Sequence, residues 1–380
     1  MSFSCTRYRW FKVAFFSGAL LLAGCAGSQR LVAPVVVDRS AAELVELFED
    51  SESSSKNLPL SPSVGQQFVP FTEDFSELPD RAPPSLAALD TSVEVYHWDV
   101  ITGGAVGNAV TGVVDFRLKR PVAVSVQGDY IYIVDAGLEA VLRYDQRDGR
   151  MSSVLDLRVA VSGEVADIYV AADHGFYITD TEGGRVLRYD SDGRLKQVFS
   201  NHFNLTKPVA VSVLEGGDLV VADGYFDHIL QFNSDGELLA TYGGRGEAAA
   251  QFINITSMSV GPDGFYAGAR VGRRIQVLSF KGDYNYSFEE GRVIFPAAIV
   301  VDRNNRGYVA DVMDNQIKVF DRGRMVGVIG GSGAGTGRFM RITDMWLDER
   351  FLYVVDSLNG RIQVARLVPE GFPGVAATAR

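Results

Sequence analysis

Short apolar runs alternate with turn residues along most of the chain. Six of these runs end in a small residue, and the next run begins six residues later with Val or Ile. The six end residues are Asp135, Asp180, Asp223, Ala269, Asp311 and Asp356. Subtracting their numbers gives spacings of 42 to 46 residues, and the segments between them are rich in β-branched and aromatic residues. This period predicts a repeated unit that is built from strands.

The repeat between residues 121 and 157 shows what one unit contains. Its predicted strands are 121–126, 130–134, 141–144 and 153–157, and turn residues separate them. The first strand is apolar throughout, as expected of a strand that is buried on both faces, and the third alternates. Six repeats of four strands predict an all-β fold, a six-bladed β-propeller. Propellers serve for binding and for catalysis, so the fold by itself selects neither.

The repeats resemble those of the NHL family. That family has a first strand entered by Pro, a second strand similar to Tyr-Val-Ala-Asp and a third similar to Arg-Ile-Gln-Val-Phe. Tyr308–Asp311 with Gln316–Asp321 is close to this pattern, and so is Tyr353–Val364. The glycine-rich loop between blades is present as Gly330–Phe339. The resemblance covers roughly residues 93–367 and implies a six-bladed propeller of NHL type, without implying an activity.

The ring of blades is expected to close through a strand from the N-terminal side. The sixth repeat supplies only three strands before Pro369, and residues 93–100 have the composition of a fourth. Pairing of that segment with the last blade would remove an exposed sheet edge.

The first 24 residues are typical of a bacterial lipoprotein signal peptide. Arg7, Arg9 and Lys12 precede an apolar stretch, 13–22, that is too short to span a membrane. Leu22-Ala23-Gly24-Cys25 then matches the lipoprotein box, which implies that Cys25 is lipidated after cleavage. The alternative is an ordinary secretory signal with a Cys by chance. Ala26 in place of Asp favours delivery to the outer membrane over retention in the inner membrane.

The sequence therefore predicts four parts. They are a signal peptide (1–24), an acidic tether rich in Pro and Ser (25–90), the propeller (91–368) and a C-terminal tail (369–380). The composition of the tether is that of a flexible spacer between membrane and propeller. The alternative is that Leu44–Phe48 or Phe68–Phe71 docks on the propeller or on a partner.

Charge and cysteine content exclude some partners and cross-links. The formal net charge is −11, and loss of the three positive charges of the signal peptide makes it −14. A chain this acidic repels phosphate backbones, which argues against a nucleic-acid partner. Cys5 leaves with the signal peptide, so Cys25 is the single Cys that remains and no disulfide is expected.

The five Asp residues that end a strand, Asp135, Asp180, Asp223, Asp311 and Asp356, are interpreted as structural. A carboxylate at one equivalent turn of each blade is placed to accept backbone N–H groups. Arg185, Arg274 and Arg361 follow five residues later and are expected to brace the same turns. The fourth blade has Ala269 and loses the carboxylate while keeping its strands. The Gly330–Gly337 loop lacks the Lys and Ser or Thr of a phosphate-binding loop.

Candidate chemistry lies at the third position of the first strands. The six residues there are Ala123, Asp167, Ala210, Ser257, Ala298 and Asp344. If the register holds, Asp167 and Asp344 face the central channel, where paired carboxylates either bind a cation or share a proton. Asp167, Asp344 and Ser257 are therefore a possible Ca²⁺ site, and the alternative is that these carboxylates bind backbone or channel water. The four histidines, His97, His174, His202 and His228, form no adjacent ligand pair, and no catalytic set is recognisable.

These observations favour a non-enzymatic binding platform, anchored to the membrane through Cys25. Its ligand would be an envelope protein or an extracellular molecule. The competing hypothesis is a calcium- or metal-dependent hydrolase or lyase with its site at the mouth of the channel. A third is a structural part of an envelope assembly that uses the acidic tether as a contact.

Overall fold

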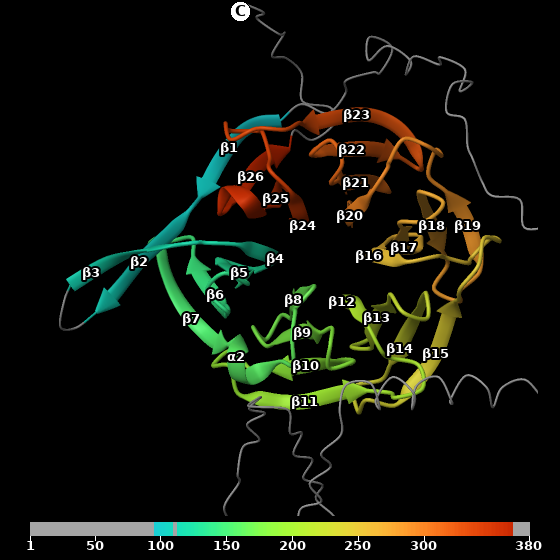
Figure 1. Ribbon diagram of the computed structural model, residues 1–380, viewed down its shortest axis with the longest axis horizontal. Coiled ribbons are helices and arrows are strands. Elements are labelled where there is room, and N and C mark those ends of the chain that lie inside the picture. Colours follow the sequence, from blue (N-terminus) through green and yellow to red (C-terminus); the bar gives the residue numbers. More distant parts are fainter. Residues whose placement is uncertain (1–94, 109–111, 368–380) are drawn as a thin grey trace, which may run out of the picture. The chain divides into compact units, whose positions relative to one another are not determined.

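The computed structural model describes residues 95–108 and 112–367, which form six sheets arranged as the blades of a propeller around a central channel (Figure 1). Each blade contains four antiparallel strands, and the first strand of each repeat is the innermost. The predicted all-β, six-bladed fold is thus confirmed. The predictions for the signal peptide, for Cys25, for the tether and for the C-terminal tail concern residues outside the described part of the chain.

The strands of the first three blades have the following bounds. Blade 1 contains β4 (Pro121–Gln127), β5 (Tyr130–Asp135), β6 (Ala140–Asp145) and β7 (Arg150–Asp156). Blade 2 contains β8 (Ile168–Val170), β9 (Phe176–Asp180), β10 (Arg185–Tyr189) and β11 (Leu195–Ser200). Blade 3 contains β12 (Pro208–Val213), β13 (Leu219–Asp223), β14 (His228–Phe232) and β15 (Leu238–Gly243).

The other three blades follow the same plan. Blade 4 contains β16 (Ile255–Gly261), β17 (Gly264–Ala269), β18 (Arg274–Leu278) and β19 (Tyr284–Ser287). Blade 5 contains β20 (Pro296–Val301), β21 (Arg306–Asp311), β22 (Gln316–Asp321) and β23 (Arg324–Gly330). Blade 6 contains β24 (Ile342–Leu347), β25 (Phe351–Asp356), β26 (Arg361–Leu367) and β1 (Val95–Ile101).

Strand β1 closes the ring as predicted, because it pairs antiparallel with β26 from Ile101, opposite Ile362, to Val95, opposite Leu367. The last blade therefore has its fourth strand from the other end of the sequence, and β26 is not left as an open edge. Since Arg361 follows directly on the turn after Asp356, the Ile101 end of β1 lies on the side of that turn and the Val95 end lies on the opposite side.

A hairpin that the sequence analysis did not anticipate follows β1. Strands β2 (Gly103–Asn108) and β3 (Gly112–Arg117) pair with each other and project from the ring, and β2 also contacts the outer strand of blade 1 through Ala105 and Arg150 (Figure 1). A Cβ atom on Gly103 would lie 1.7 Å from the carbonyl oxygen of Phe116. Glycine is required there because the two backbones approach so closely.

Blade 1 also corrects one predicted boundary. Its outer strand begins at Arg150 rather than at residue 153, and Leu157 belongs to the short helix α2 (Leu157–Ala160). The Asp156 carboxylate accepts the N–H of Arg158 and caps this helix. Another short helix, η3 (Ser357–Asn359), forms the turn after β25. No helix within the described ranges is long and apolar enough to cross a membrane.

The hydrophobic core lies between adjacent blades. Buried side chains of blades 1 and 2 form one cluster, in which the rings of Tyr132 and Phe176 are 5.9 Å apart, and Phe199 contacts Phe232 across the next junction at 6.2 Å. Full burial of such a side chain stabilises the fold by about 1.5–3 kcal/mol. Because each blade buries its faces against two neighbours, the inner strands are held in a fixed ring around the channel.

Candidate binding site in the central channel

The inner strands enclose a cavity of about 1940 Å³. Its wall consists of residues from β8, β12, β16, β20 and β24 together with Val124 of β4, and loop residues of both propeller faces complete it. One of these faces carries the turns between second and third strands, at 136–139, 181–184, 224–227, 270–273, 312–315 and 357–360, and we call it the anchor face. The opening of the cavity on this face, the channel mouth, includes Lys207, Arg270, Phe295, Met313, Arg341 and Leu358.

Asp167 and Asp344 both line the cavity, and each reaches along its wall to the next blade. Asp167 Oδ2 accepts a hydrogen bond of 2.8 Å from the backbone N–H of Val211 in blade 3. Asp344 Oδ2 accepts one of the same length from the N–H of Val124 in blade 1. Innermost strands are sheet edges, so their N–H groups on the channel side lack a strand partner. The two carboxylates satisfy two of these edge amides and link neighbouring blades.

The electrostatics of the two carboxyls are unfavourable for a double negative charge. Both residues are half-buried and line the cavity. Burial raises the pKa of Asp167 to about 7, against the opposing effect of the N–H groups of Val211 and Ile168. Burial, and secondly the charge of Asp167, raise the pKa of Asp344 well above its usual value. The pair therefore tends to hold a proton near neutral pH.

Ser257, the third member of the predicted cation site, also lines the cavity, but its hydroxyl is placed differently. Its side chain is buried, and its Oγ has no hydrogen-bond partner. A Cβ atom added to Gly268 would lie 2.9 Å from this Oγ and 3.0 Å from Ile299 of the next blade, so the hydroxyl faces the junction between blades 4 and 5. Within the described ranges, no three His, Cys, Asp or Glu residues are grouped so as to hold a metal ion. A calcium site at Asp167, Asp344 and Ser257 stays a prediction.

The five Asp residues that end the second strands are fully buried and bind backbone amides. Asp135 accepts the N–H groups of Lys119 and Arg120, before the blade, and those of Gly137 and Leu138, in the turn after β5. Each carboxylate thus ties the entrance of its blade to the turn at the end of the second strand, and this explains why Asp recurs at this position in the sequence.

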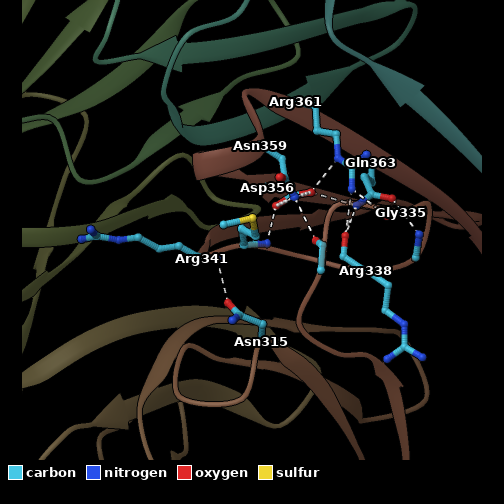
Figure 2. A network of polar contacts seen from close by, with 11 residues as sticks. Asn315, Gly335, Arg338, Arg341, Asp356, Asn359, Arg361 and Gln363 are labelled. Carbon is cyan, nitrogen blue, oxygen red and sulfur yellow. Dashed lines mark hydrogen bonds and ion pairs between the residues drawn. The ribbon is translucent and has the colours of Figure 1, made fainter.

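In three blades a cation neutralises the buried carboxylate. Arg185 Nε lies 2.8 Å from Asp180 Oδ2, and Arg361 Nε lies 2.6 Å from Asp356 Oδ2. Figure 2 shows the Asp356 carboxylate at the centre of such a network, which also includes Asn359 and Gln363.

In blade 5 the cation is Lys318, which sequence analysis did not single out. Its Nζ lies 2.6 Å from Asp311 Oδ2 and 2.9 Å from Asp314 Oδ2. Lys318 follows Asp311 by seven residues rather than by five, so the spacing shared by the arginines did not reveal it.

Blade 4 lacks this carboxylate, and Asp227 of blade 3 takes its place. Asp227 is fully buried, accepts the N–H of Ile255 at the entrance of blade 4, and forms an ion pair with Arg245 at 2.7 Å. Arg274 was expected to brace the turn of its own blade, but blade 4 has Ala269 in place of the Asp with which Arg274 would pair. Its side chain instead donates a hydrogen bond to the carbonyl oxygen of Glu247. Asp227 was not found from the sequence because it belongs to a different repeat from the strand that it supports.

A second feature that the sequence analysis did not identify is an arc of exposed apolar side chains on the anchor face. The residue two positions after the end of the second strand is Tyr225, Val271, Met313 and Leu358 in blades 3 to 6. These side chains are 56%, 49%, 62% and 58% exposed, respectively. We call them the apolar arc. Blades 1 and 2 have Gly137 and Glu182 at the equivalent position, so the arc covers one side of the ring only.

Three cations stand beside the arc at the channel mouth. Lys207, Arg270 and Arg341 are exposed, and none of them forms an ion pair with a carboxylate of the described residues. The guanidinium of Arg270 lies over the ring of Phe295, 4.4 Å from its centroid. Acidic residues of the cavity other than Asp167 and Asp344 are Glu215 and Asp302, on turns of the opposite face. The mouth is therefore both apolar and positively charged.

Comparison with known sequences identifies the architecture and not the ligand. Residues 297–364 match a protein family described as a 6-bladed beta-propeller. No curated protein sequence matches the chain.

Solved structures show the same fold at low sequence identity. Virginiamycin B lyase from Staphylococcus aureus is 11% identical, with a TM-score of 0.53 over 72% of this chain and 100% of the lyase. A gluconolactonase from Xanthomonas campestris is 13% identical, with a TM-score of 0.53 over 71% of this chain and 98% of that protein. A Bacteroides thetaiotaomicron protein of unknown function is also 13% identical, with a TM-score of 0.54 over 71% and 76%. At these identities the likeness extends to the fold alone.

Proposed function

We propose that this protein is a membrane-anchored binding platform, and that its recognition surface is the channel mouth with the apolar arc. The observation that carries the proposal is the exposure of four large apolar side chains at one equivalent position of four successive blades. Soluble proteins rarely leave apolar side chains gathered on one face unless a partner covers them. The unpaired cations beside the arc add electrostatic selectivity for an anionic partner.

The lipoprotein box at Cys25 supports a location in the bacterial envelope, with the propeller held near the membrane by the tether. The proposed partner is accordingly an envelope protein or an extracellular ligand. The NHL-type repeats fit this role, because propellers present their loops as a rigid platform.

Site-specific photo-crosslinking in cells tests the platform. A photoreactive residue in place of Met313 should give one discrete adduct, which is lost when Leu358→Asp is added. The matched control replaces Leu239, which is similarly exposed on the outer strand of blade 3, and should not give that adduct. An identical adduct pattern from both positions, or an adduct that is insensitive to Leu358→Asp, would refute the proposed surface.

The competing function is a hydrolase or lyase in the channel, and the acidic pair on the cavity wall is the observation in its favour. Asp167, with its pKa near 7, has the property of a general acid or base at neutral pH. If this hypothesis is correct, purified protein should cleave a lactone or virginiamycin B, and Asp167→Asn should abolish turnover while leaving the Met313 adduct intact. A Met313 adduct in a protein whose wild type shows no turnover would favour the platform.

A further inference from the structure

A second cavity lies on the anchor face, beside the channel mouth. Its volume of about 420 Å³ is within the range of about 300–1,000 Å³ that is typical of small-molecule sites. Residues of blades 6 and 1 and of the connection between blades 1 and 2 form its wall, and we call it the side pocket. Arg341, Thr343 and Leu358 also line the channel cavity, whereas the other residues of the wall line the side pocket alone.

Charged side chains of both signs line the side pocket without pairing with one another. Four exposed residues of its wall, none of which forms an ion pair with a described residue, are Arg120, Glu139, Glu164 and Arg341. The remaining charged residue of the wall, Arg158, is paired with Asp156 at 2.6 Å. The side pocket therefore presents two positive and two negative groups that lack a counter-ion.

Hydrogen bonds fix the backbones of the two cations. The carbonyl oxygen of Arg120 accepts the N–H of Ala136 at 2.9 Å, at the start of the turn after β5. The carbonyl oxygen of Arg341 accepts the N–H of Ser357 at 3.2 Å. Figure 2 shows the side chain of Arg341 extending away from the network around Asp356. Both guanidinium groups are thus attached at fixed points, and their planar arrays of N–H donors suit a carboxylate.

The two carboxylates are attached to the wall in the same way. The carbonyl oxygen of Glu139 accepts the N–H of Leu157 at 2.8 Å, which links the turn of blade 1 to α2. The carbonyl oxygen of Glu164 accepts the N–H of Thr181 at 3.1 Å, at the start of the turn after β9. Because the backbones of all four charged residues are fixed, the cost of ordering these residues around a ligand is reduced.

Apolar side chains form much of the remaining wall. Val134, Leu157 and Val165 are buried, and Leu358 is exposed. An apolar group of a ligand would remove this surface from water, which favours binding.

The balance of charges selects the class of ligand. A simple anion would leave the two glutamates without counter-charge, and a simple cation would leave the two arginines without it. A ligand that carries a carboxylate and an ammonium group at different atoms neutralises both sets. Amino acids and short peptides with apolar side chains combine these two groups with the apolar surface that the wall requires.

We propose that the side pocket binds the zwitterion of an amino acid or short peptide that has apolar side chains. The two arginines hold its carboxylate, and the two glutamates hold its ammonium group. This inference goes beyond the binding platform, because it assigns a second site with a ligand of its own. It does not depend on the apolar arc, since Arg120, Glu139 and Glu164 lie outside the channel mouth.

Isothermal titration calorimetry of the purified full-length protein in detergent tests the site. The probes are leucine, leucyl-leucine, N-acetyl-leucyl-leucine and leucyl-leucine amide. We expect leucyl-leucine or leucine to bind with a dissociation constant on the order of 100 μM. The acetylated and amidated peptides should bind at least about tenfold more weakly than leucyl-leucine, because each lacks one charged group. The tighter of leucine and leucyl-leucine identifies the free amino acid or the peptide as the ligand.

Variants of the wall connect each charge of the ligand to its partner. Arg120→Gln should weaken the binding of leucyl-leucine about tenfold and reduce its advantage over the amide. Glu164→Gln should likewise reduce the advantage of leucyl-leucine over the acetylated peptide. The matched controls are Arg273→Gln and Glu247→Gln, at exposed positions that line neither cavity, and both should leave the affinities unchanged.

Two results would overturn the proposal. The first is equal affinity for leucyl-leucine, its acetylated form and its amide, or no binding of any probe. The second is an affinity that the control variants lower as much as the variants of the wall. The platform is tested separately by the Met313 adduct. If the adduct forms but no probe binds, the side pocket fails and the platform stands, whereas binding of the probes without an adduct leaves the side pocket and removes the platform.

Discussion

Replacing Asp167 with Asn tests the electrostatics of the channel directly. The amide oxygen of Asn still accepts the N–H of Val211, so the link between blades 2 and 3 is kept while the negative charge is removed, but the amide NH2 then faces the N–H of Ile168, which Asp167 Oδ1 accepts in the wild type. The loss of that local bond is the same at every pH, so the change of the stability difference with pH reports the cost of ionising a carboxyl on the cavity wall beside Asp344. We expect Asp167→Asn to stabilise the protein at alkaline pH and to have little effect at acidic pH.

The magnitude follows from the pKa. Asp167 titrates at about 7 in the folded protein and at 3.8 in the unfolded chain. Because the folded pKa is raised, this group's stabilising contribution is complete below about pH 4 and is lost as the pH rises through 7. A difference of about three units corresponds to about 4 kcal/mol as an upper limit. Cavity water lowers this figure, and we expect Asp167→Asn to gain about 2 kcal/mol at pH 8.5, which is a rise in Tm of about 4–8 °C.

Thermal and urea unfolding of wild type, Asp167→Asn and the double variant with Asp344→Asn, measured between pH 4.5 and 8.5, provide the assay. The difference between wild type and variant should grow with pH. If Asp167→Asn instead destabilises the protein equally at both ends of this range, the fold requires the ionised carboxylate, and the reasoning is wrong. Added Ca²⁺ tests whether the pair binds a cation. A rise in the Tm of the wild type that is absent from the double variant would establish a cation at this pair.

Three further predictions concern other parts of the chain. Cys25→Ser should move the protein from the membrane fraction to the soluble fraction, and retention after detergent-free washing would contradict the lipid anchor. A chain that begins at residue 85 should unfold cooperatively, whereas one that begins at residue 105 lacks β1 and should aggregate through the free edge of β26; equal melting curves would argue against this closure. Asp356→Ala should cost about 3–5 kcal/mol in urea unfolding because it leaves Arg361, whose side chain is only 11% exposed, without its counter-ion, and exposed Asp148→Ala should cost less than about 1 kcal/mol; similar losses would show that the network contributes little.

The repeat along the chain determined the architecture. Strand composition, turn residues and a period of 42–46 residues predicted six blades, and the shortage of one strand in the last repeat predicted that β1 would close the ring. These features are local in sequence, or recur at a fixed spacing, so one chain was enough to read them. The hairpin of β2 and β3 was not predicted, because it belongs to no repeat and depends on a close approach of two backbones at Gly103.

The directions in which the channel side chains point could be read only from the structure. The alignment of first strands placed Asp167 and Asp344 at one position, yet the partner of each carboxylate is an amide of the following blade, 44 and 220 residues away. Ser257 shares that position and lines the cavity, but its shorter side chain makes no hydrogen bond to a neighbouring blade. A distance of this kind depends on how two sheets pack, which the composition of either strand does not specify.

The channel mouth shows most clearly what the sequence leaves undecided. Tyr225, Val271, Met313 and Leu358 are four different residue types in four repeats, and apolar residues are ordinary in strand-rich segments, so their pattern carried no signal along the chain. Only closure of the ring brings them to one face, together with Lys207, Arg270 and Arg341. Local periodicity thus determined the strands, whereas the apolar arc and its neighbouring cations were decided by the tertiary structure, because these residues meet only when the blades pack side by side.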